Sequence, residues 1–222
     1  NDTMEVIYKI SYLNYTHLNL SAAYKGFWNI VQNYPGHTTS YGSGYLILDI
    51  LNRQKEYSKL VVACQKFLVT KQFIKADFRN DVADVLRHAE LKKILLVETK
   101  GNYKEAAEAY LEYTKAYGTQ DELLHEKALF NASVNYFKHG DTLASLEVQE
   151  RFLRRFPNSQ SKENILLQVA KTYETLANFE KAALYYEQLA MQFPTQKQAN
   201  TALRLSGLYY WGSKNYTKAE AV

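Results

Sequence analysis

The hydrophobic positions of residues 165–222 repeat with a period of 37 residues. A fixed period of about 20–50 residues indicates an array of repeated units rather than a single globular core. The pairs of positions related by this shift are Leu166 and Leu203, Ala170 and Gly207, Tyr173 and Tyr210, and Ala182 and Ala219. The same shift backwards places Phe193-Pro194 on Phe156-Pro157. The pattern therefore predicts a chain built from repeats.

Each unit contains two amphipathic helical patterns, in which apolar residues recur at spacings of three and four. The first pattern runs from Glu163 to Leu176 and the second from Phe179 to Phe193. Asn178 lies in the predicted turn between them, and Pro194 follows the second helix, which a proline cannot continue. The apolar positions are Leu166, Val169, Ala170 and Tyr173 in the first helix, and Ala182, Ala183, Tyr186, Leu189 and Ala190 in the second.

The unit resembles the tetratricopeptide repeat, a helix–turn–helix of about 34 residues. That family places a large, a small and an aromatic residue on the first helix, then a small residue, an aromatic and a terminal proline on the second. The matching residues are Leu166, Ala170, Tyr173, Ala182, Tyr186 and Pro194. The resemblance implies an all-α fold, a right-handed α-solenoid of about five and a half helix–turn–helix repeats.

Each unit is longer than the family norm because the loop that joins two repeats, Thr195–Asn200, is longer. Phe-Pro endings with long joining loops are similar to those of bacterial cell-envelope proteins, such as outer-membrane assembly lipoproteins and periplasmic cell-division coordinators. This resemblance favours the periplasm or cell envelope over the cytoplasm as the location.

The rest of the chain is predicted to continue as a single solenoid over residues 1–222. The repeats are expected at about 4–35, 41–73, 77–118, 122–157, 160–194 and 197–222, the last one truncated. In the first repeat, Ile7, Ile10, Ser11 and Asn14 are expected on the packed side of the first helix. Because no initiating Met is present and Val222 interrupts a helical pattern begun at Tyr216, we expect a fragment of a longer chain.

One interval departs from the regular spacing. The predicted turns at Lys55 and Gly101 are 46 residues apart, and the stretch Ala76 to Lys100 contains no Gly or Pro. It predicts either one long helix or a short extra helix with a bend near Asp77–Asn80.

Composition and charge narrow the class of protein. The 222 residues are 46% hydrophobic and 23% charged, which is typical of a folded domain. The net charge of +4 is mild and the basic residues do not cluster, so a nucleic-acid partner is not expected. The sequence contains no apolar run of about 18 residues, so no membrane-spanning helix is predicted. The single cysteine, Cys64, cannot form an intrachain disulfide and is predicted to be a buried thiol on a helix.

No catalytic, metal or cofactor site is predicted. The five histidines are scattered, no pair has the HExxH form, and no glycine-rich phosphate loop is present. His88 and His125 fall in helical patterns and are predicted to be surface or hydrogen-bonded histidines. We therefore expect a protein that is not an enzyme and holds no cofactor.

The resemblance also implies a binding surface, because in that family the first helix of each repeat lines a concave groove that binds peptides. The predicted groove residues are Tyr8, Tyr12, Tyr15, Tyr45, Asp49, Arg53, Lys92, Lys127, Phe130, Asn131, Phe137, Lys171, Arg204 and Trp211. The first six are largely aromatic, and the later ones are more basic.

These residues lead to the hypothesis of an interaction scaffold that binds a protein or peptide segment, with an acidic segment favoured by the basic positions. The alternative from another class is a helical accessory domain of a larger cell-wall enzyme whose catalytic domain lies elsewhere. A third interpretation is an ordinary solvated helix face without a ligand. The sequence leaves the partner and the oligomeric state open.

Overall fold

A computed structural model describes residues 2–222, and between these residues the regular structure is entirely helical. The twelve helices of this range are α1 (Asp2–Thr16), α2 (Leu20–Asn33), α3 (Thr38–Arg53), α4 (Tyr57–Val69), α5 (Ala76–Thr99), α6 (Tyr103–Tyr117), α7 (Glu122–His139), α8 (Thr142–Arg155), α9 (Lys162–Thr175), α10 (Phe179–Gln192), α11 (Ala199–Gly212) and α12 (Tyr216–Ala221). The chain forms two compact units, α1 to α5 and α6 to α12.

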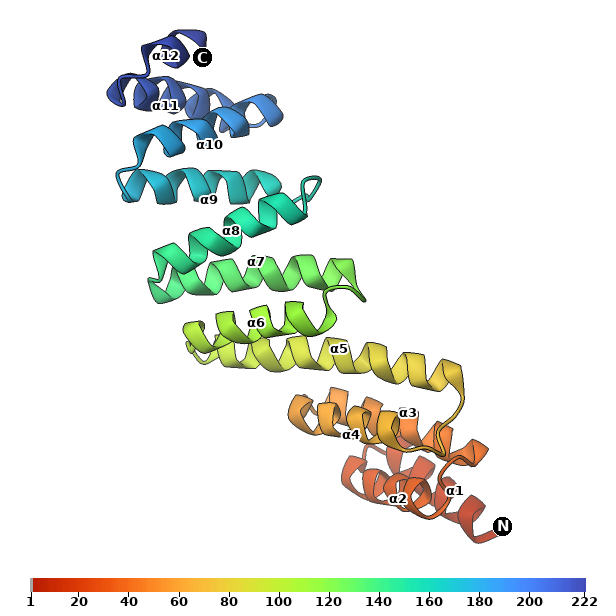
Figure 1. The fold of residues 1–222 in the computed structure, drawn as a ribbon. Coiled ribbons are helices and arrows are strands. Elements are labelled where there is room, and N and C mark those ends of the chain that lie inside the picture. Colours follow the sequence, from red (N-terminus) through yellow and green to blue (C-terminus); the bar gives the residue numbers. More distant parts are fainter. Residues whose placement is uncertain (1) are drawn as a thin grey trace. The chain divides into compact units, whose positions relative to one another are not determined.

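In the first unit each helix packs against the next along the chain, from α1 to α5 (Figure 1). An aromatic cluster fills the space between α3, α4 and the start of α5. The ring of Phe78 lies 5.1 Å from that of Tyr41, 5.5 Å from that of Phe67 and 5.2 Å from that of Phe73. Edge-to-face and offset-stacked pairs at these separations add to the free energy gained by burial alone. Cys64 is buried beside this cluster, and burial raises the pKa of its thiol to about 12.

In the second unit the helices from α6 to α12 likewise pack in sequence order (Figure 1). Small side chains occupy the places where helices touch, and Ala106, Ser145 and Ala182 are all fully buried. A small side chain lets two helix backbones approach closely, and the predicted small residue Ala182 is confirmed as a buried contact point. Ser145 also donates a hydrogen bond from Oγ to the carbonyl of Ser133, at 2.9 Å, which ties α8 to α7.

A residue with positive φ lies in the turn between α1 and α2 and in every second turn after it. These residues are Leu18 (62°), Lys55 (57°), Gly101 (83°), Gly140 (89°), Ala177 (54°) and Lys214 (62°). Their separations are 37, 46, 39, 37 and 37 residues, so the backbone reproduces the period seen in the hydrophobic pattern. A residue in the left-handed region ends a helix and allows the chain to reverse.

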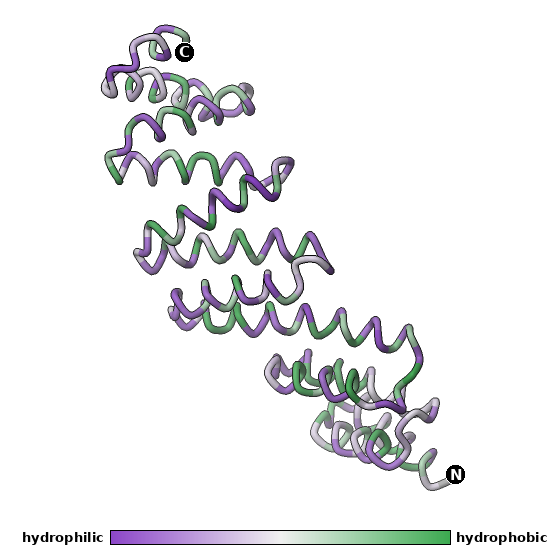
Figure 2. The backbone as a smooth tube through the Cα atoms, viewed as in Figure 1, coloured by the Kyte–Doolittle hydropathy of each residue, from purple (hydrophilic) through white to green (hydrophobic). Residues whose placement is uncertain are grey.

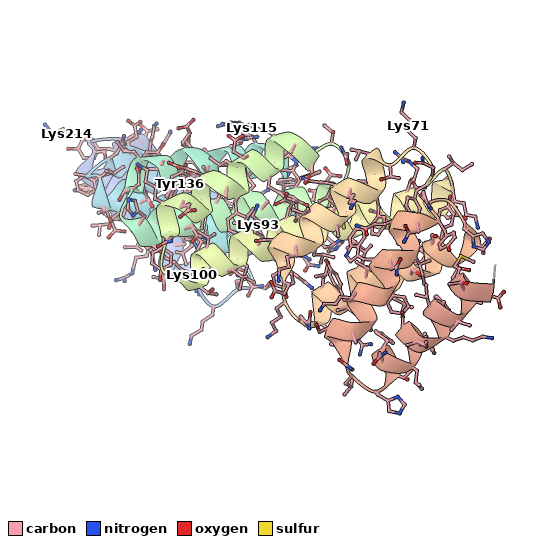
Figure 3. All side chains as sticks on the ribbon, turned by 90° about the horizontal axis from the view of Figure 1, so that it is seen from below. Lys71, Lys93, Lys100, Lys115, Tyr136 and Lys214 are labelled. Atoms are coloured by element: carbon pink, nitrogen blue, oxygen red, sulfur yellow. The ribbon has the colours of Figure 1, made fainter. Side chains whose placement is uncertain are left out.

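Several helices begin with a side chain that caps the first turn. Asp121, Asp141, Asn178 and Asn215 accept hydrogen bonds from the backbone N–H three residues later, at 2.9, 3.1, 3.2 and 3.4 Å. Such a cap satisfies one of the N–H groups that an α-helix leaves without a partner at its start. Hydrophobic and hydrophilic stretches alternate along the helices (Figure 2). Long polar side chains such as that of Lys71 extend outward (Figure 3).

The long interval before Gly101 forms one long helix and not a short helix with a bend, because α5 is a single continuous helix of 24 residues. The prediction for α1 is wrong at Ile10, which is 56% exposed. Asn14 is half-buried and donates its amide to the carbonyl of Ile10 at 2.9 Å. Ser11 is buried against α2, beside Gly26. The division of the chain into the six proposed repeats stays a prediction.

Candidate interaction groove

The predicted groove residues of α7 lie on one face of that helix, because Phe130 and Asn131 follow Lys127 by three and four residues and Phe137 lies two turns beyond Phe130. The helix presents this face toward the start and the body of α9. Two hollows open along it, and both are bounded by α7 on one side and by the α9 segment on the other.

The first hollow, named here the Lys127 hollow, has a volume of about 310 Å³. It is lined by Glu126, Lys127, Phe130 and Asn131 of α7 and by Ser161, which directly precedes α9. Glu126 accepts a hydrogen bond from Ser159 Oγ at 2.6 Å, so its carboxylate is held toward the loop. The ammonium group of Lys127 makes no ion pair among the described residues.

The second hollow, named here the Phe137 hollow, has a volume of about 510 Å³. It lies between the carboxyl-terminal half of α7 and the side of α9. Its lining residues are Val134, Phe137, Thr142, Gln168, Lys171, Thr172 and Thr175. Phe137 is 61% exposed at its rim, which is unusual for a large aromatic side chain in a monomer. The ammonium group of Lys171 likewise makes no ion pair among the described residues.

Hydrogen bonds from α8 fix the α9 side of the Phe137 hollow. Gln149, which is fully buried, donates from Nε2 to Gln168 Oε1 at 3.1 Å and to Ser145 Oγ at 3.2 Å. Tyr173 donates to Glu150 Oε1 at 2.6 Å. Burial, followed by this hydrogen bond, raises the pKa of Tyr173, so the phenol stays a donor at neutral pH.

Arg204 and Trp211 lie on α11 and are exposed, but neither lines the Lys127 hollow or the Phe137 hollow. The ring of Trp211 instead packs edge-on against Tyr216 of α12, with 4.9 Å between the centroids. The structure therefore brings together five of the predicted residues of this unit, namely Lys127, Phe130, Asn131, Phe137 and Lys171.

In the first unit, the predicted aromatic residues of α1 form a row along the helix. The rings of Tyr8 and Tyr12 lie 6.2 Å apart, as do those of Tyr12 and Tyr15. Tyr15 donates to Asp49 Oδ2 at 2.5 Å, and Arg53 pairs with the same carboxylate at 2.6 Å while lying 5.4 Å from the Tyr15 ring. The charges at this end of the row are thus paired with each other.

The other two predicted residues of this unit lie at a hollow of about 410 Å³ between α3 and α5. Tyr45 donates to Asp81 Oδ2 at 2.6 Å, and burial together with this bond raises the pKa of its phenol to about 12. Lys92 spans the hollow to donate to Asn52 Oδ1 at 3.1 Å. Because of these internal contacts, the hollow between α3 and α5 has fewer polar groups available to a ligand than the two hollows between α7 and α9.

The sequence missed several lining residues. Gln168, Thr172 and Thr175 flank Lys171 on α9 at helical spacing, so the periodicity that selected Lys171 could also have selected them. Asp81 and Ser161 carry no comparable local signal, because each meets the groove residues only through packing between elements.

Residues 2–222 contain no cluster of three or more His, Cys, Asp or Glu side chains arranged to hold a metal ion. None of the described helices is both long enough and apolar enough to cross a bilayer.

His125 is 8% exposed and donates from Nδ1 to the carbonyl of Gly118 at 3.1 Å, while Nε2 has no hydrogen-bond partner among the described residues.

Comparisons with known proteins find distant structural similarity alone. No family model matches the chain, and no curated protein matches it. Similar solved structures include BtubC (BKLC) from P. vanneervenii, with a TM-score of 0.48, 13% identity, and coverage of 92% of this chain and 85% of that one. Another is a tetratricopeptide repeat protein from Parabacteroides merdae, with a TM-score of 0.43, 14% identity, and coverage of 100% and 77%. A third is pilF of Pseudomonas aeruginosa, with a TM-score of 0.42, 15% identity, and coverage of 99% and 88%.

The fold assignment rests on the chain's own packing, since these likenesses are distant. Successive helix pairs, positive-φ turns at a 37-residue spacing and buried small residues between helices define a helical repeat array. This is the all-α architecture that the tetratricopeptide resemblance implies.

Proposed function

We propose that this chain is a protein-interaction scaffold that binds an acidic segment of a partner protein along the groove between α7 and α9. One observation supports the proposal above all others. The Lys127 hollow and the Phe137 hollow lie between the same two helices, and each combines a phenylalanine with a lysine that has no ion pair among the described residues.

The two kinds of residue would contribute differently to binding. Buried aromatic anchors dominate the free energy of association at protein interfaces, and Phe130 and Phe137 are positioned to provide them. Lysines spaced along a groove mainly raise the association rate and set the register of an acidic ligand. The segment that fits therefore alternates carboxylates with large apolar side chains.

Envelope proteins are the first partners to test within this proposal. The reason is the resemblance of the Phe-Pro endings, at Phe156-Pro157 and Phe193-Pro194, to those of bacterial cell-envelope repeat proteins.

The test uses fluorescein-labelled peptides of about 12 residues that alternate Glu with Leu or Phe, a length that spans a few helix turns. Lys171→Glu should slow association, by up to about tenfold, and flatten its dependence on salt concentration. Phe137→Ala should mainly speed dissociation, with a loss of about 1–2 kcal/mol. Stopped-flow fluorescence anisotropy separates the two rates.

The matched control is Lys197→Glu, which makes the same charge change at an exposed position in the loop between α10 and α11. It should leave both rate constants near those of the wild type. Equal binding by wild type, Lys171→Glu and Phe137→Ala would contradict the proposal.

A further inference from the structure

The side of the first unit formed by α2 and α4 combines lysines with exposed apolar side chains. An exposed stripe runs along α4 at spacings of three, four and three, and its residues are Lys59, Val62, Lys66 and Val69. A hollow of about 530 Å³ separates this stripe from α2. The stripe and the hollow are named here the lysine face. The lysine face lies between the second helices of two successive pairs, so described parts of the chain flank it on both sides.

The lysine face carries no carboxylate. Residues 6–48 and 57–76 contain no Asp or Glu, whereas the second helices of the later pairs, α6, α8 and α10, each contain two or three Glu. Glu56 lies just before α4 and pairs with Lys59 at 3.3 Å. The ammonium group of Lys66 makes no ion pair among the described residues. The face is therefore positively charged, and nothing on it neutralises this charge beyond the first turn of α4.

Aromatic rings line the α2 side of the hollow. Trp28 stacks on the buried ring of Phe67 with 5.5 Å between the centroids, and Tyr24 packs edge-on against Trp28 at 6.1 Å. The ammonium group of Lys66 lies over the Trp28 ring, 4.6 Å from its centroid. Tryptophan, tyrosine and lysine are the residues that proteins place where they meet the headgroup layer of a bilayer, because each joins an apolar body to a polar end.

The loop between α4 and α5 extends this face and is held in place by its own contacts. Phe73 is buried in the aromatic cluster, and Tyr41 Oη accepts a hydrogen bond from the backbone N–H of Ile74 at 3.1 Å. The side chain of Ile74 is nevertheless 78% exposed, and that of Val69 at the end of α4 is 77% exposed. Lys71 lies between them in the sequence, extends outward (Figure 3) and makes no ion pair among the described residues. Two aliphatic side chains thus stand in water beside an unpaired lysine, on a loop whose neighbours are anchored.

We infer that the lysine face and the adjoining loop bind the surface of a membrane that contains anionic lipids. Val69 and Ile74 insert at the boundary between headgroups and acyl chains, where buried apolar area stabilises the bound state. Lys66 and Lys71 contact the lipid phosphates, and each lysine near an anionic bilayer adds to the attraction.

Two features favour a bilayer over an acidic protein as the occupant. The most exposed apolar side chains protrude from the face, whereas a protein ligand is normally held by side chains that fill recesses. All cations of the face are lysines, which act as point charges and lack the bidentate geometry by which arginine recognises a carboxylate. The face lies in a different unit from the groove of α7 and α9, so the inference stands independently of the proposed function.

The test is co-sedimentation of the 222-residue protein with vesicles of phosphatidylcholine alone or of phosphatidylcholine mixed with phosphatidylglycerol. We expect binding to the anionic vesicles alone, weakened by added salt because salt screens exposed charges. Lys71→Glu should lower the partition coefficient at least about fivefold, since it removes one cation and adds a negative charge. Ile74→Ser should lower it by a similar factor, through the loss of inserted apolar area.

Matched controls make the same changes in the second unit. Lys197→Glu alters an exposed lysine of the loop between α10 and α11, and Leu143→Ser alters a leucine of α8 that is 67% exposed. Both should bind anionic vesicles like the wild type. In Trp211→Phe the remaining tryptophan is Trp28, and lipids brominated in the upper acyl chain should quench its fluorescence.

Equal binding to neutral and anionic vesicles, or wild-type binding by both Lys71→Glu and Ile74→Ser, would overturn the inference. Bound protein with unquenched Trp28 would also overturn it, because another surface would then meet the lipid. Weaker binding of an acidic peptide by Lys71→Glu, without any vesicle binding by the wild type, would show that the face binds an acidic protein instead of a membrane.

Discussion

Tyr210 of α11 donates a hydrogen bond to Glu187 of α10 at 2.7 Å, and the same bond occurs one period earlier, from Tyr173 of α9 to Glu150 of α8 at 2.6 Å. Both the donors and the acceptors are 37 residues apart. The ammonium group of Lys218 lies over the ring of Tyr210, 5.1 Å from its centroid, and that of Lys181 lies over the ring of Tyr173 at 4.9 Å. The helices α9 and α11 therefore share a hydrogen bond to the helix before them, in addition to the hydrophobic pattern.

Tyr210→Phe should destabilise the second unit by about 0.5–1.5 kcal/mol, because the ring stays buried while Glu187 loses its donor. Urea unfolding measures the change. Tyr216→Phe serves as the control, since Tyr216 is 48% exposed, and it should unfold like the wild type. An unchanged midpoint for Tyr210→Phe would show that the tie contributes nothing to stability.

The protein should lose stability as the pH falls below about 6.5, the ordinary pKa of histidine. Burial lowers the pKa of His125 in the folded chain, and the positive charges of Arg155 and Arg151 act in the same direction, while the bond to Gly118 and the charge of Glu122 oppose them. The unfolded chain then binds a proton before the folded one does. Stability is therefore complete above the unfolded pKa and is lost as the pH falls through the folded pKa.

The measurement is the free energy of unfolding between pH 7.5 and pH 5 in His125→Gln, whose amide keeps a donor for Gly118 but cannot titrate. The pH dependence should be shallower than in the wild type. His88→Gln changes an exposed histidine and should retain the wild-type slope. Identical slopes for wild type and His125→Gln would contradict the assignment.

Ala182→Leu should cost about 1–3 kcal/mol, because it inserts a large side chain where α10 meets its neighbour and no space remains. Ala116→Leu makes the same change at an exposed position of α6 and should have little effect on the thermal melt. Wild-type stability in Ala182→Leu would count against the position of this residue in the repeat.

Gly140→Ala should destabilise by about 1 kcal/mol for a purely conformational reason. The φ of Gly140 is 89°, and a Cβ there would meet no atom within 4 Å.

Conversely, Ala177→Gly at φ 54° should change stability by less than about 1 kcal/mol, since relief of backbone strain is offset by the greater freedom of glycine when unfolded. Differential scanning calorimetry compares both variants with the wild type. Equal melting temperatures for Gly140→Ala and wild type would contradict the loss of stability expected for Gly140→Ala.

The elements that could be predicted from the sequence are those encoded by local periodicity. The hydrophobic pattern located the turns at Lys55 and Asn178, and the small residue of the repeat pattern located the buried contact of Ala182. Each of these signals lies within one helix pair, where spacing alone determines which side chains share a face.

The positions that were predicted wrongly or missed depend on contacts between elements. An apolar residue on a helix can face either its own pair or the next one, so periodicity could not show that Ile10 lies on the uncovered side of α1. The burial of His125 likewise follows from the close approach of Gly118, where a Cβ would come within 2.7 Å of the imidazole. The pairing of Gln168 with Gln149 has the same origin.

Amide chemical shifts recorded on titration with the acidic, apolar peptide report whether a ligand occupies the groove between α7 and α9. The largest changes should fall on α7 between Lys127 and Phe137 and on α9 between Gln168 and Thr175. Changes confined to the exposed positions around Leu143 of α8 and Leu184 of α10, with α7 and α9 unaffected, would contradict it.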